Sequence, residues 1–169
     1  FEKHLQTKIL KALFKNHVYE EVAYEIYQLE NKHQNIGLGR VGEFENALSE
    51  TEFLQLVKDK LQCGGIRHSV FTGKAIKKVA VLGGSGSFAI KNAIHSGADA
   101  YLTADLKYHQ FYEAENQLLL ADIGHFESER YTKNYIVDFL KEKITNFAPD
   151  LSQDRIVLSE ENTNPVKYL

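Results

Sequence analysis

Three short apolar runs, each followed by a helical pattern, constrain the fold of this chain more than any other feature. The runs lie at residues 77–84 (KKVAVLGG), 99–105 (DAYLTAD) and 117–124 (QLLLADIG). The helical patterns that follow them cover residues 87–97, 106–116 and 125–144. Apolar strands that lead into helices are typical of a parallel sheet with helices packed on it. We therefore predict an α/β fold with a mainly parallel or mixed sheet flanked by helices.

The residues before these runs have the patterns of further strands and one more helix. Residues 41–45 predict a short strand, and Ser49 followed by Glu52 is a capping-box signature that opens a helix over residues 51–62. Two more strands are predicted at residues 66–73 and, before a polar tail, within residues 155–169.

The N-terminal part has the pattern of a separate, partial α/β unit. Residues 4–15 place apolar side chains at helical intervals, and residues 22–29 alternate β-branched or aromatic residues with polar ones, which predicts a strand. A polar, glycine-punctuated stretch at about residues 31–37 predicts a boundary, so we divide the chain into residues 1–35 and 36–169. Because the chain begins inside a helical pattern and not with Met, we expect it to be a piece of a longer protein.

Charge and cysteine content argue against several classes of function. The chain has 20 basic and 23 acidic residues and a formal net charge of -3, which argues against a broad nucleic-acid or anionic-membrane footprint. The longest apolar runs are far shorter than the roughly 20 residues of a membrane-spanning helix. Cys63 is the only cysteine, so one chain can form neither an internal disulfide nor a thiolate zinc cluster, and a reducing, cytoplasmic location is expected.

Ligands of open α/β sheets bind outside the carboxyl ends of the strands, and three such corners carry polar residues. The first corner is GGSGS, which contains Gly83, Gly84, Ser85 and Gly86. Its amides at a helix start would suit an anion. The spacing matches neither the dinucleotide-binding nor the phosphate-loop pattern, so a tight strand-to-helix turn stays open as the alternative.

The second corner, TADLKYH, brings Asp105, Lys107 and His109 to the end of an apolar strand. Asp105 and His109 are four residues apart, so both could face one side of a helix. The alternatives are an Asp105 that only caps the helix and a His109 with a structural hydrogen bond.

The third corner, ADIGHFESER, places His125 and Glu129 four residues apart, directly after a strand. This spacing puts an imidazole and a carboxylate on one helical face, where both can reach one cation. The alternative is a simple ion pair or a capped turn. Two ligands are too few for a zinc or two-metal centre, so further ligands would have to come from elsewhere.

Together, the strings GGSGSF, GADAYLTADLKYHQF and ADIGHFESE resemble the C-terminal half of the GTP cyclohydrolase 1 type 2 homolog family, also called the Nif-three-like family. The string GLGRVGE at residues 37–43 resembles the start of the same half. Residues 17–21, HVYEE, resemble the HPYEE signature of a PII-like α/β domain that longer members insert between their halves, although Val18 replaces Pro. The resemblance implies that residues 1–35 are the closing part of this inserted domain.

The resemblance also implies a dinuclear metal site with His125 and Glu129 as two of its ligands. The family's other ligands, an adjacent His pair and an Asp, lie in its N-terminal half, and this sequence has no adjacent His pair. The site is therefore expected to be incomplete here. Asp105, Lys107 and His109 match the family's motif beside the site and are expected to be pocket residues, as is the GGSG segment.

The resemblance leaves two classes of function open. The first is a metal-dependent hydrolase of a nucleotide-like or small anionic substrate, as the family name suggests. The second is a non-enzymatic metal-binding, regulatory or scaffolding protein. Two divalent ions per full-length chain and a homo-oligomer, a hexameric ring in the family, are implied in both cases. Zinc, iron, manganese, cobalt and nickel all suit His with carboxylate, so the metal's identity stays open.

Overall fold

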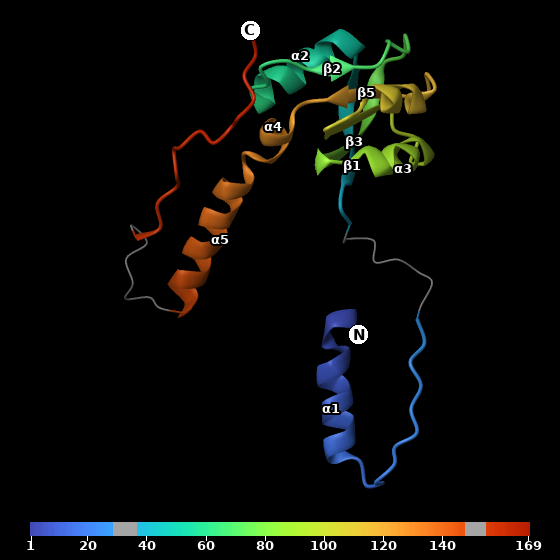
Figure 1. Ribbon diagram of the computed structural model, residues 1–169, viewed down its shortest axis with the longest axis vertical. Helices are drawn as coiled ribbons and strands as arrows, with labels where there is room; N and C mark the ends of the chain where they lie inside the picture. Colours follow the sequence, from blue (N-terminus) through green and yellow to red (C-terminus); the bar gives the residue numbers. More distant parts are fainter. Residues whose placement is uncertain (29–36, 148–154) are drawn as a thin grey trace. The chain divides into compact units, whose positions relative to one another are not determined.

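The computed structural model of this protein describes residues 1–28, 37–147 and 155–169, and its contacts divide the chain into two units, 1–36 and 37–169 (Figure 1). The first unit contains a 3-10 turn, η1 (Lys3–Leu5), that continues into helix α1 (Gln6–Asn16). The helix predicted at residues 4–15 is thus confirmed. That this unit closes an inserted PII-like domain stays a prediction.

The strand predicted at residues 22–29 is not formed in its described part. Residues 22–28 pair with no strand, and residue 29 and most of the predicted boundary at 31–37 lie outside the described residues. The Phe14 and Tyr24 rings meet edge to face with centroids 5.4 Å apart. A lone strand leaves its backbone groups without hydrogen-bond partners, so an alternating pattern alone cannot produce one.

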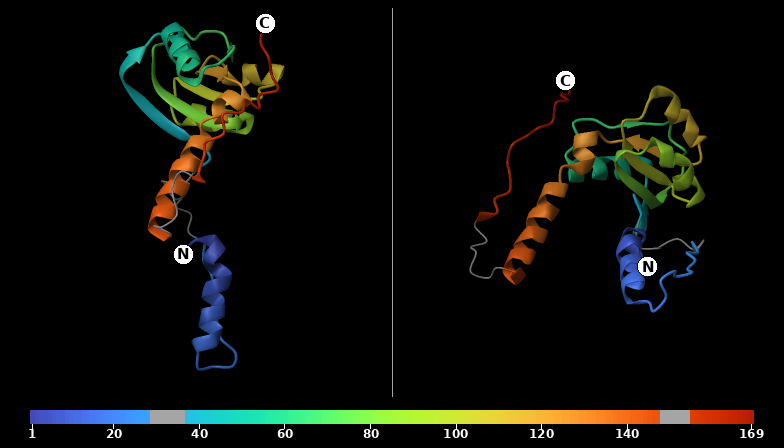
Figure 2. Two further views of the ribbon diagram at one scale, coloured as in Figure 1. Left: turned by 90° about the vertical axis from the view of Figure 1, so that its left-hand side faces the viewer. Right: turned by 60° about the horizontal axis from the view of Figure 1, so that its bottom comes forward.

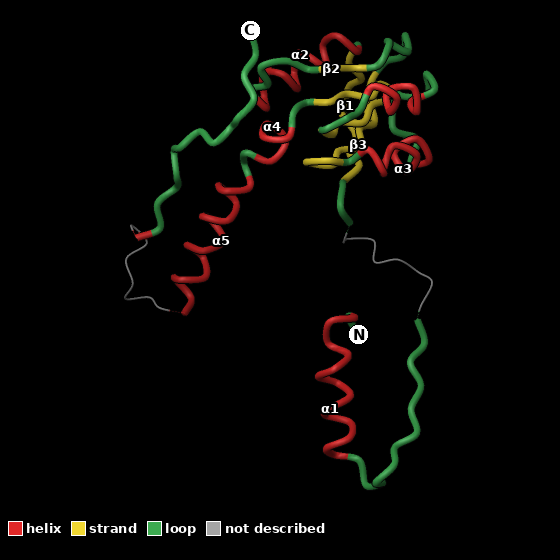
Figure 3. The backbone as a smooth tube through the Cα atoms, viewed as in Figure 1, coloured by secondary structure: helices red, strands yellow, loops and turns green. Residues whose placement is uncertain are grey.

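The second unit contains a five-stranded mixed sheet in the order β1-β3-β4-β5-β2. The strands are β1 (Arg40–Leu48), β2 (Arg67–His68), β3 (Ile76–Ser85), β4 (Ala100–Ala104) and β5 (Leu119–Asp122) (Figure 3). The central strands β3, β4 and β5 are parallel, and the edge strands β1 and β2 pair with them antiparallel. The predicted α/β fold is confirmed.

Helical segments cover both faces of this sheet (Figure 2). They are α2 (Glu50–Leu61), η2 (Ser87–Ala89) with α3 (Ile90–His95), η3 (Tyr108–Ala114) and α4 (His125–Glu129). Helix α5 (Thr132–Phe147) follows α4 and buries none of its residues. On one face α2 buries Phe53 against Leu119 of β5, and on the other face α3 buries Ile90 against Leu120. Successive residues of one strand thus enter opposite cores, which explains the continuous apolar runs in the sequence.

Several predicted elements differ in extent or type. The strand predicted at 66–73 is only two residues long, and residues 155–169 contain no strand. The helix predicted at 106–116 is a 3-10 helix that ends at left-handed Glu115, and the one predicted at 125–144 is broken into α4 and α5. No described helix is long and apolar enough to cross a membrane.

Candidate functional site

The three predicted corners meet at one edge of the sheet because β3, β4 and β5 run parallel. Gly84 and Ser85 end β3, Asp105 follows β4, and His125 begins α4 three residues after the last residue of β5. The β3 ladder shifts register between Val81 and Ser85, so the last residues of β3 leave the regular pleat. These shared strand ends bring together residues that are distant in the sequence.

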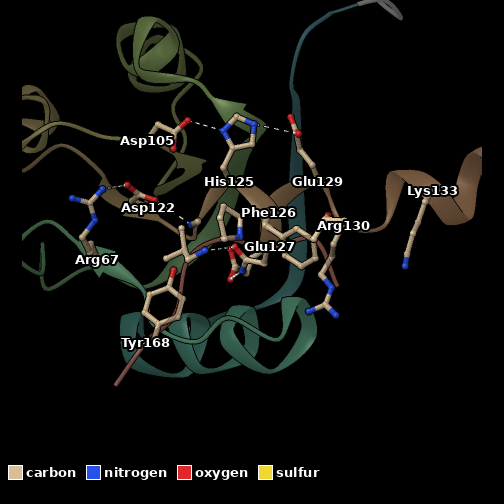
Figure 4. A pocket seen from close by; sticks show the side chains of 15 residues that line it. Arg67, Asp105, Asp122, His125, Phe126, Glu127, Glu129, Arg130, Lys133 and Tyr168 are labelled. Carbon is tan, nitrogen blue, oxygen red and sulfur yellow. Dashed lines mark hydrogen bonds and ion pairs between the residues drawn. The ribbon is translucent and has the colours of Figure 1, made fainter. Parts of the chain in front are cut away.

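His125 is the centre of a short chain of polar contacts (Figure 4). Its Nδ1 lies 2.6 Å from Oδ2 of Asp105, and its Nε2 lies 3.3 Å from Oε2 of Glu129. Asp105 also accepts a hydrogen bond from the Ser85 hydroxyl. The side chains of His125 and Glu129 are 51% and 52% exposed, so solvent or a ligand can reach both.

These contacts shift the pKa values of both central groups. The Ser85 hydroxyl, and after it the His125 imidazole, hold the pKa of the Asp105 carboxyl below its usual value. The hydrogen bond to Asp105 raises the pKa of His125, and Glu129 adds to this, whereas partial desolvation acts in the opposite direction. A carboxylate on each side of the ring therefore favours the protonated imidazole when no cation is bound.

The GGSGS segment packs directly under α4. The Gly84 amide donates to the Ser128 hydroxyl at 2.8 Å, so this amide is used within the protein. Gly84 has a φ of +67°, and a Cβ at this position would lie 2.6 Å from Oε1 of Glu129. Only glycine allows α4 to come this close to β3 without strain.

The residues of the second corner occupy different places. Asp105 has a left-handed backbone (φ 58°) and directs its carboxylate to Ser85 and His125, so it does not cap a helix. Lys107, directly before η3, and His109, on η3, are both exposed, and neither lines the cavity beside His125. Their assignment as pocket residues stays a prediction.

A cavity of about 710 Å³ adjoins His125 and Glu129. It lies among β2, the strand ends, α4, the start of α5 and the C-terminal segment. Its lining includes Arg67, Asp105, Asp122, His125, Phe126, Glu127, Glu129, Arg130, Lys133, Asn164 and Tyr168.

Several of these lining residues carried no clear signal in the sequence. Arg67 lies inside a predicted strand, yet it pairs with the buried Asp122. Glu127 is 4% exposed and accepts a hydrogen bond from the side-chain amide of Asn164 at 3.0 Å. A charged residue in an apolar run, such as Asp122 after LLLA, is the one hint that could have been followed.

Within the described ranges, no group of three or more His, Cys, Asp or Glu side chains is arranged to hold a metal ion. Asp105 and Glu129 contact opposite nitrogens of the His125 ring, so they do not converge on one point. His125 Nε2 and the Glu129 carboxylate are thus the pair that could share one cation.

A family model described as Duf34/NIF3 (NGG1p interacting factor 3) matches residues 2–165. The GTP cyclohydrolase 1 type 2 homolog of Bacillus subtilis (strain 168) is 37% identical over 175 residues, which cover 100% of this chain and 44% of that protein. The crystal structure of a Bacillus cereus protein related to NIF3 has a TM-score of 0.73 and 33% identity, covering 100% of this chain and 46% of that one.

A more distant solved structure is reduced HcgD from Methanocaldococcus jannaschii, with a TM-score of 0.51 and 32% identity over 63% of this chain and 43% of that chain. This chain therefore spans less than half the length of these relatives.

Proposed function

This chain belongs to the Duf34/NIF3 family, and we propose that His125 and Glu129 contribute two ligands to a divalent-metal site. The complete protein would hold two such ions, with its remaining ligands outside these 169 residues. The residues present fit one part of that site. They do not complete it.

The observation that carries this proposal is the 3.3 Å separation between His125 Nε2 and Glu129 Oε2. Two ligand atoms that each lie about 2.1 Å from a tetrahedrally coordinated ion are roughly 3.4 Å apart. The Asp105 carboxylate lies on the other ring nitrogen, as is usual for histidines that bind metals. This hydrogen bond would hold the proton on Nδ1 and leave Nε2 free for the ion.

We further propose that the complete protein hydrolyses a nucleotide-like or other small anionic substrate. The cavity beside His125 supports this proposal because Arg67, Arg130 and Lys133 line it together with the rings of Phe126 and Tyr168. Guanidinium and ammonium groups bind phosphates, and aromatic rings offer a face to a base. A divalent cation would supply Lewis acidity to such a reaction.

A second candidate is a metal-binding protein without catalytic activity. In the described part of the chain, each carboxylate that lines the cavity already has a partner. Asp105 and Glu129 contact His125, Asp122 pairs with Arg67, and Glu127 accepts from Asn164. A general base would have to come from outside these residues or be released when the metal binds.

Two further parts of the proposal concern the complete protein. We propose that it forms a homo-oligomer, in line with the ring implied by the resemblance, and light scattering of the purified protein would give its mass. We also propose a cytoplasmic location, which the single free thiol of Cys63 supports.

The metal proposal is tested by elemental analysis of this chain and of the full-length protein, each with a His125→Ala/Glu129→Ala variant. We expect about two ions per full-length chain, fewer on this chain, and loss from both variants because the paired ligands are gone. A matched control is the Glu2→Ala/His4→Ala variant, which removes an exposed His–Glu pair that also lies 3.3 Å apart.

An unchanged metal content in the His125→Ala/Glu129→Ala variant would contradict the proposal. If metal is lost as expected, turnover of nucleotide substrates by the full-length protein separates the two candidates. Metal-dependent hydrolysis supports the enzyme, and stable metal binding without hydrolysis of any tested nucleotide supports the second candidate.

A further inference from the structure

Asp122, the last residue of β5, is a buried carboxylate that accepts three hydrogen bonds. Its Oδ2 accepts from the Leu106 amide at 2.9 Å and from the Arg67 guanidinium, and its Oδ1 accepts from the Gly124 amide at 3.1 Å. Its side chain is only 5% exposed, so these partners satisfy a charge that the core would otherwise exclude.

The two amides that Asp122 binds are the sequence neighbours of the site residues. Leu106 directly follows Asp105, and Gly124 directly precedes His125. One carboxylate therefore joins the turn after β4 to the turn after β5. The distance between Asp105 Oδ2 and His125 Nδ1 depends on how these two turns are placed.

Arg67 also binds the turn after β4. It lies opposite Asp122 in the β2–β5 pair, and its Nη2 donates to the Leu106 carbonyl at 2.9 Å. Its guanidinium also lies over the Phe111 ring, 5.6 Å from the centroid. Both backbone groups of Leu106 are thus bound by the Arg67–Asp122 pair.

Asp105 needs this support because its own backbone is strained. A left-handed conformation (φ 58°) is unfavourable for a residue other than glycine unless its surroundings hold it. Leu106 is 2% exposed, so its buried side chain and the hydrogen bond from its backbone amide to Asp122 together fix the turn. A displacement of about 1 Å would lengthen the 2.6 Å contact to His125 beyond hydrogen-bond range.

We propose that Asp122 and Arg67 are positioning residues that align the Asp105 carboxylate with Nδ1 of His125. Neither contacts His125 itself; they act through Leu106 and Gly124. The consequence for metal binding rests on the proposed function, but the alignment of Asp105 with His125 does not.

Two variants test the pair. Asp122→Asn replaces one acceptor oxygen by an amide that points a donor at the Arg67 guanidinium or at a backbone amide. Arg67→Met keeps the buried carboxylate but frees the Leu106 carbonyl, and it changes a side chain that is 62% exposed on an edge strand. The second variant keeps the test usable if Asp122→Asn does not fold.

The matched control is Asp99→Asn. Asp99 also accepts from two backbone amides, those of Lys77 at 2.9 Å and Lys78 at 2.7 Å, but it precedes β4, at the opposite end of that strand from the candidate site. The control therefore measures the general cost of losing a carboxylate that binds backbone amides.

Two measurements on the folded chain decide the question. Nitrogen-15 NMR of metal-free protein, recorded at a pH high enough for the His125 imidazole to be neutral, shows which ring nitrogen carries the single proton. We expect the proton on Nδ1 in the wild type and in Asp99→Asn, and a reduced Nδ1–H population in both test variants. Zn²⁺ affinity, measured by competition with a coloured chelator, should fall about tenfold in the test variants and stay unchanged in the control.

The inference is overturned if His125 keeps its Nδ1 proton in both test variants, or if Asp99→Asn changes the His125 signals as much as they do. A changed proton position without any Zn²⁺ binding by the wild type supports the positioning role and counts against the proposed metal function. The two failures are thus distinguishable.

Discussion

At the scale of single residues, the candidate site depends on backbone conformations that few residue types allow. Gly84 and Asp105 both have positive φ, and both contact the His125–Glu129 pair or lie against it. The spacing of His125 and Glu129 alone predicts that they share a helical face, and the family resemblance is what singles them out as metal ligands. The hydrogen bond between Asp105 and His125 could not be predicted from local spacing, because those residues are 20 positions apart.

Gly84→Ala should disturb the site through a direct steric contact. The new Cβ would lie 2.6 Å from Oε1 of Glu129 and 3.4 Å from Cε1 of His125, so the carboxylate must move away. Urea unfolding should show a loss of about 1 kcal/mol or more from the backbone alone, and metal content should fall.

The matched control for this change is Gly73→Ala. Gly73 has a similar φ of +74°, but a Cβ there meets nothing within 4 Å. We expect a similar loss of stability and unchanged metal content in the control. Equal metal content in Gly84→Ala and Gly73→Ala would contradict the expectation that a Cβ at Gly84 displaces the Glu129 carboxylate.

Cys63 should react slowly in the folded protein. Burial, and after it the nearby Glu127, raise the pKa of this thiol to about 11. With an ordinary pKa near 9, the unfolded chain has about 100 times more thiolate at neutral pH, so iodoacetamide should label it correspondingly faster. Mass spectrometry of native and urea-unfolded protein gives the two rates, and similar rates would show that the thiol is accessible.

The same shift predicts a dependence of stability on pH. The folded state favours the neutral thiol, so its contribution to stability is complete below pH 9 and is lost as the pH rises toward about 11. Cys63→Ser should remove this part of the alkaline loss in urea titrations.

At the scale of elements, local signals predicted helix α2 well and η3 poorly. The capping box is present as predicted: the Ser49 hydroxyl accepts from the Glu52 amide at 3.3 Å, and Glu52 Oε2 accepts from the Ser49 amide at 2.9 Å. The residues at 108–114 have a helical pattern but form a 3-10 helix that ends at two left-handed residues, Glu115 and Asn116. A 3-10 helix and an α-helix have similar apolar spacing over one or two turns, so sequence does not separate them.

Ser49→Ala should destabilise the protein by about 1 kcal/mol because the first turn of α2 loses its cap. The Ser49 hydroxyl, and then its amide, lower the pKa of Glu52 from 4.5. The contribution of Glu52 to the free energy of unfolding is therefore present above pH 4.5 and is lost as the pH falls below it. Thermal unfolding at pH 7 and pH 3 should show a smaller effect of Ser49→Ala at pH 3. Thr51→Ala, an exposed change in the same turn, is the control and should not show this pH dependence.

At the scale of the larger unit, the C-terminal segment closes one side of the cavity. Asn164 donates to the buried Glu127, and the Tyr168 ring lies against Gly64 and Gly65. No strand pairing holds residues 155–169, so these side-chain contacts decide where the segment lies. The cavity wall thus depends on contacts that local sequence patterns do not encode.

Gly64→Ala should displace this segment. A Cβ at Gly64 would lie 2.1 Å from Cδ2 of Tyr168, so the ring has to leave its position. Hydrogen exchange of residues 163–168 should become faster, as mass spectrometry can measure. Gly42→Ala, where a Cβ meets nothing within 4 Å, is the control. Unchanged exchange in Gly64→Ala would show that Tyr168 does not pack there.

The sequence by itself determined the α/β class, the parallel centre of the sheet, the cap of α2 and the contact between His125 and Glu129, whose role as metal ligands stays a prediction. These features follow from local periodicity, from spacing within one turn, or from motif resemblance. Tertiary structure decided that residues 22–28 form no strand, that Asp105 faces His125, and that Arg67 and Asp122 hold the turns of the site. The Arg67–Asp122 contact joins residues 55 positions apart, and only the order and register of the strands bring such residues together.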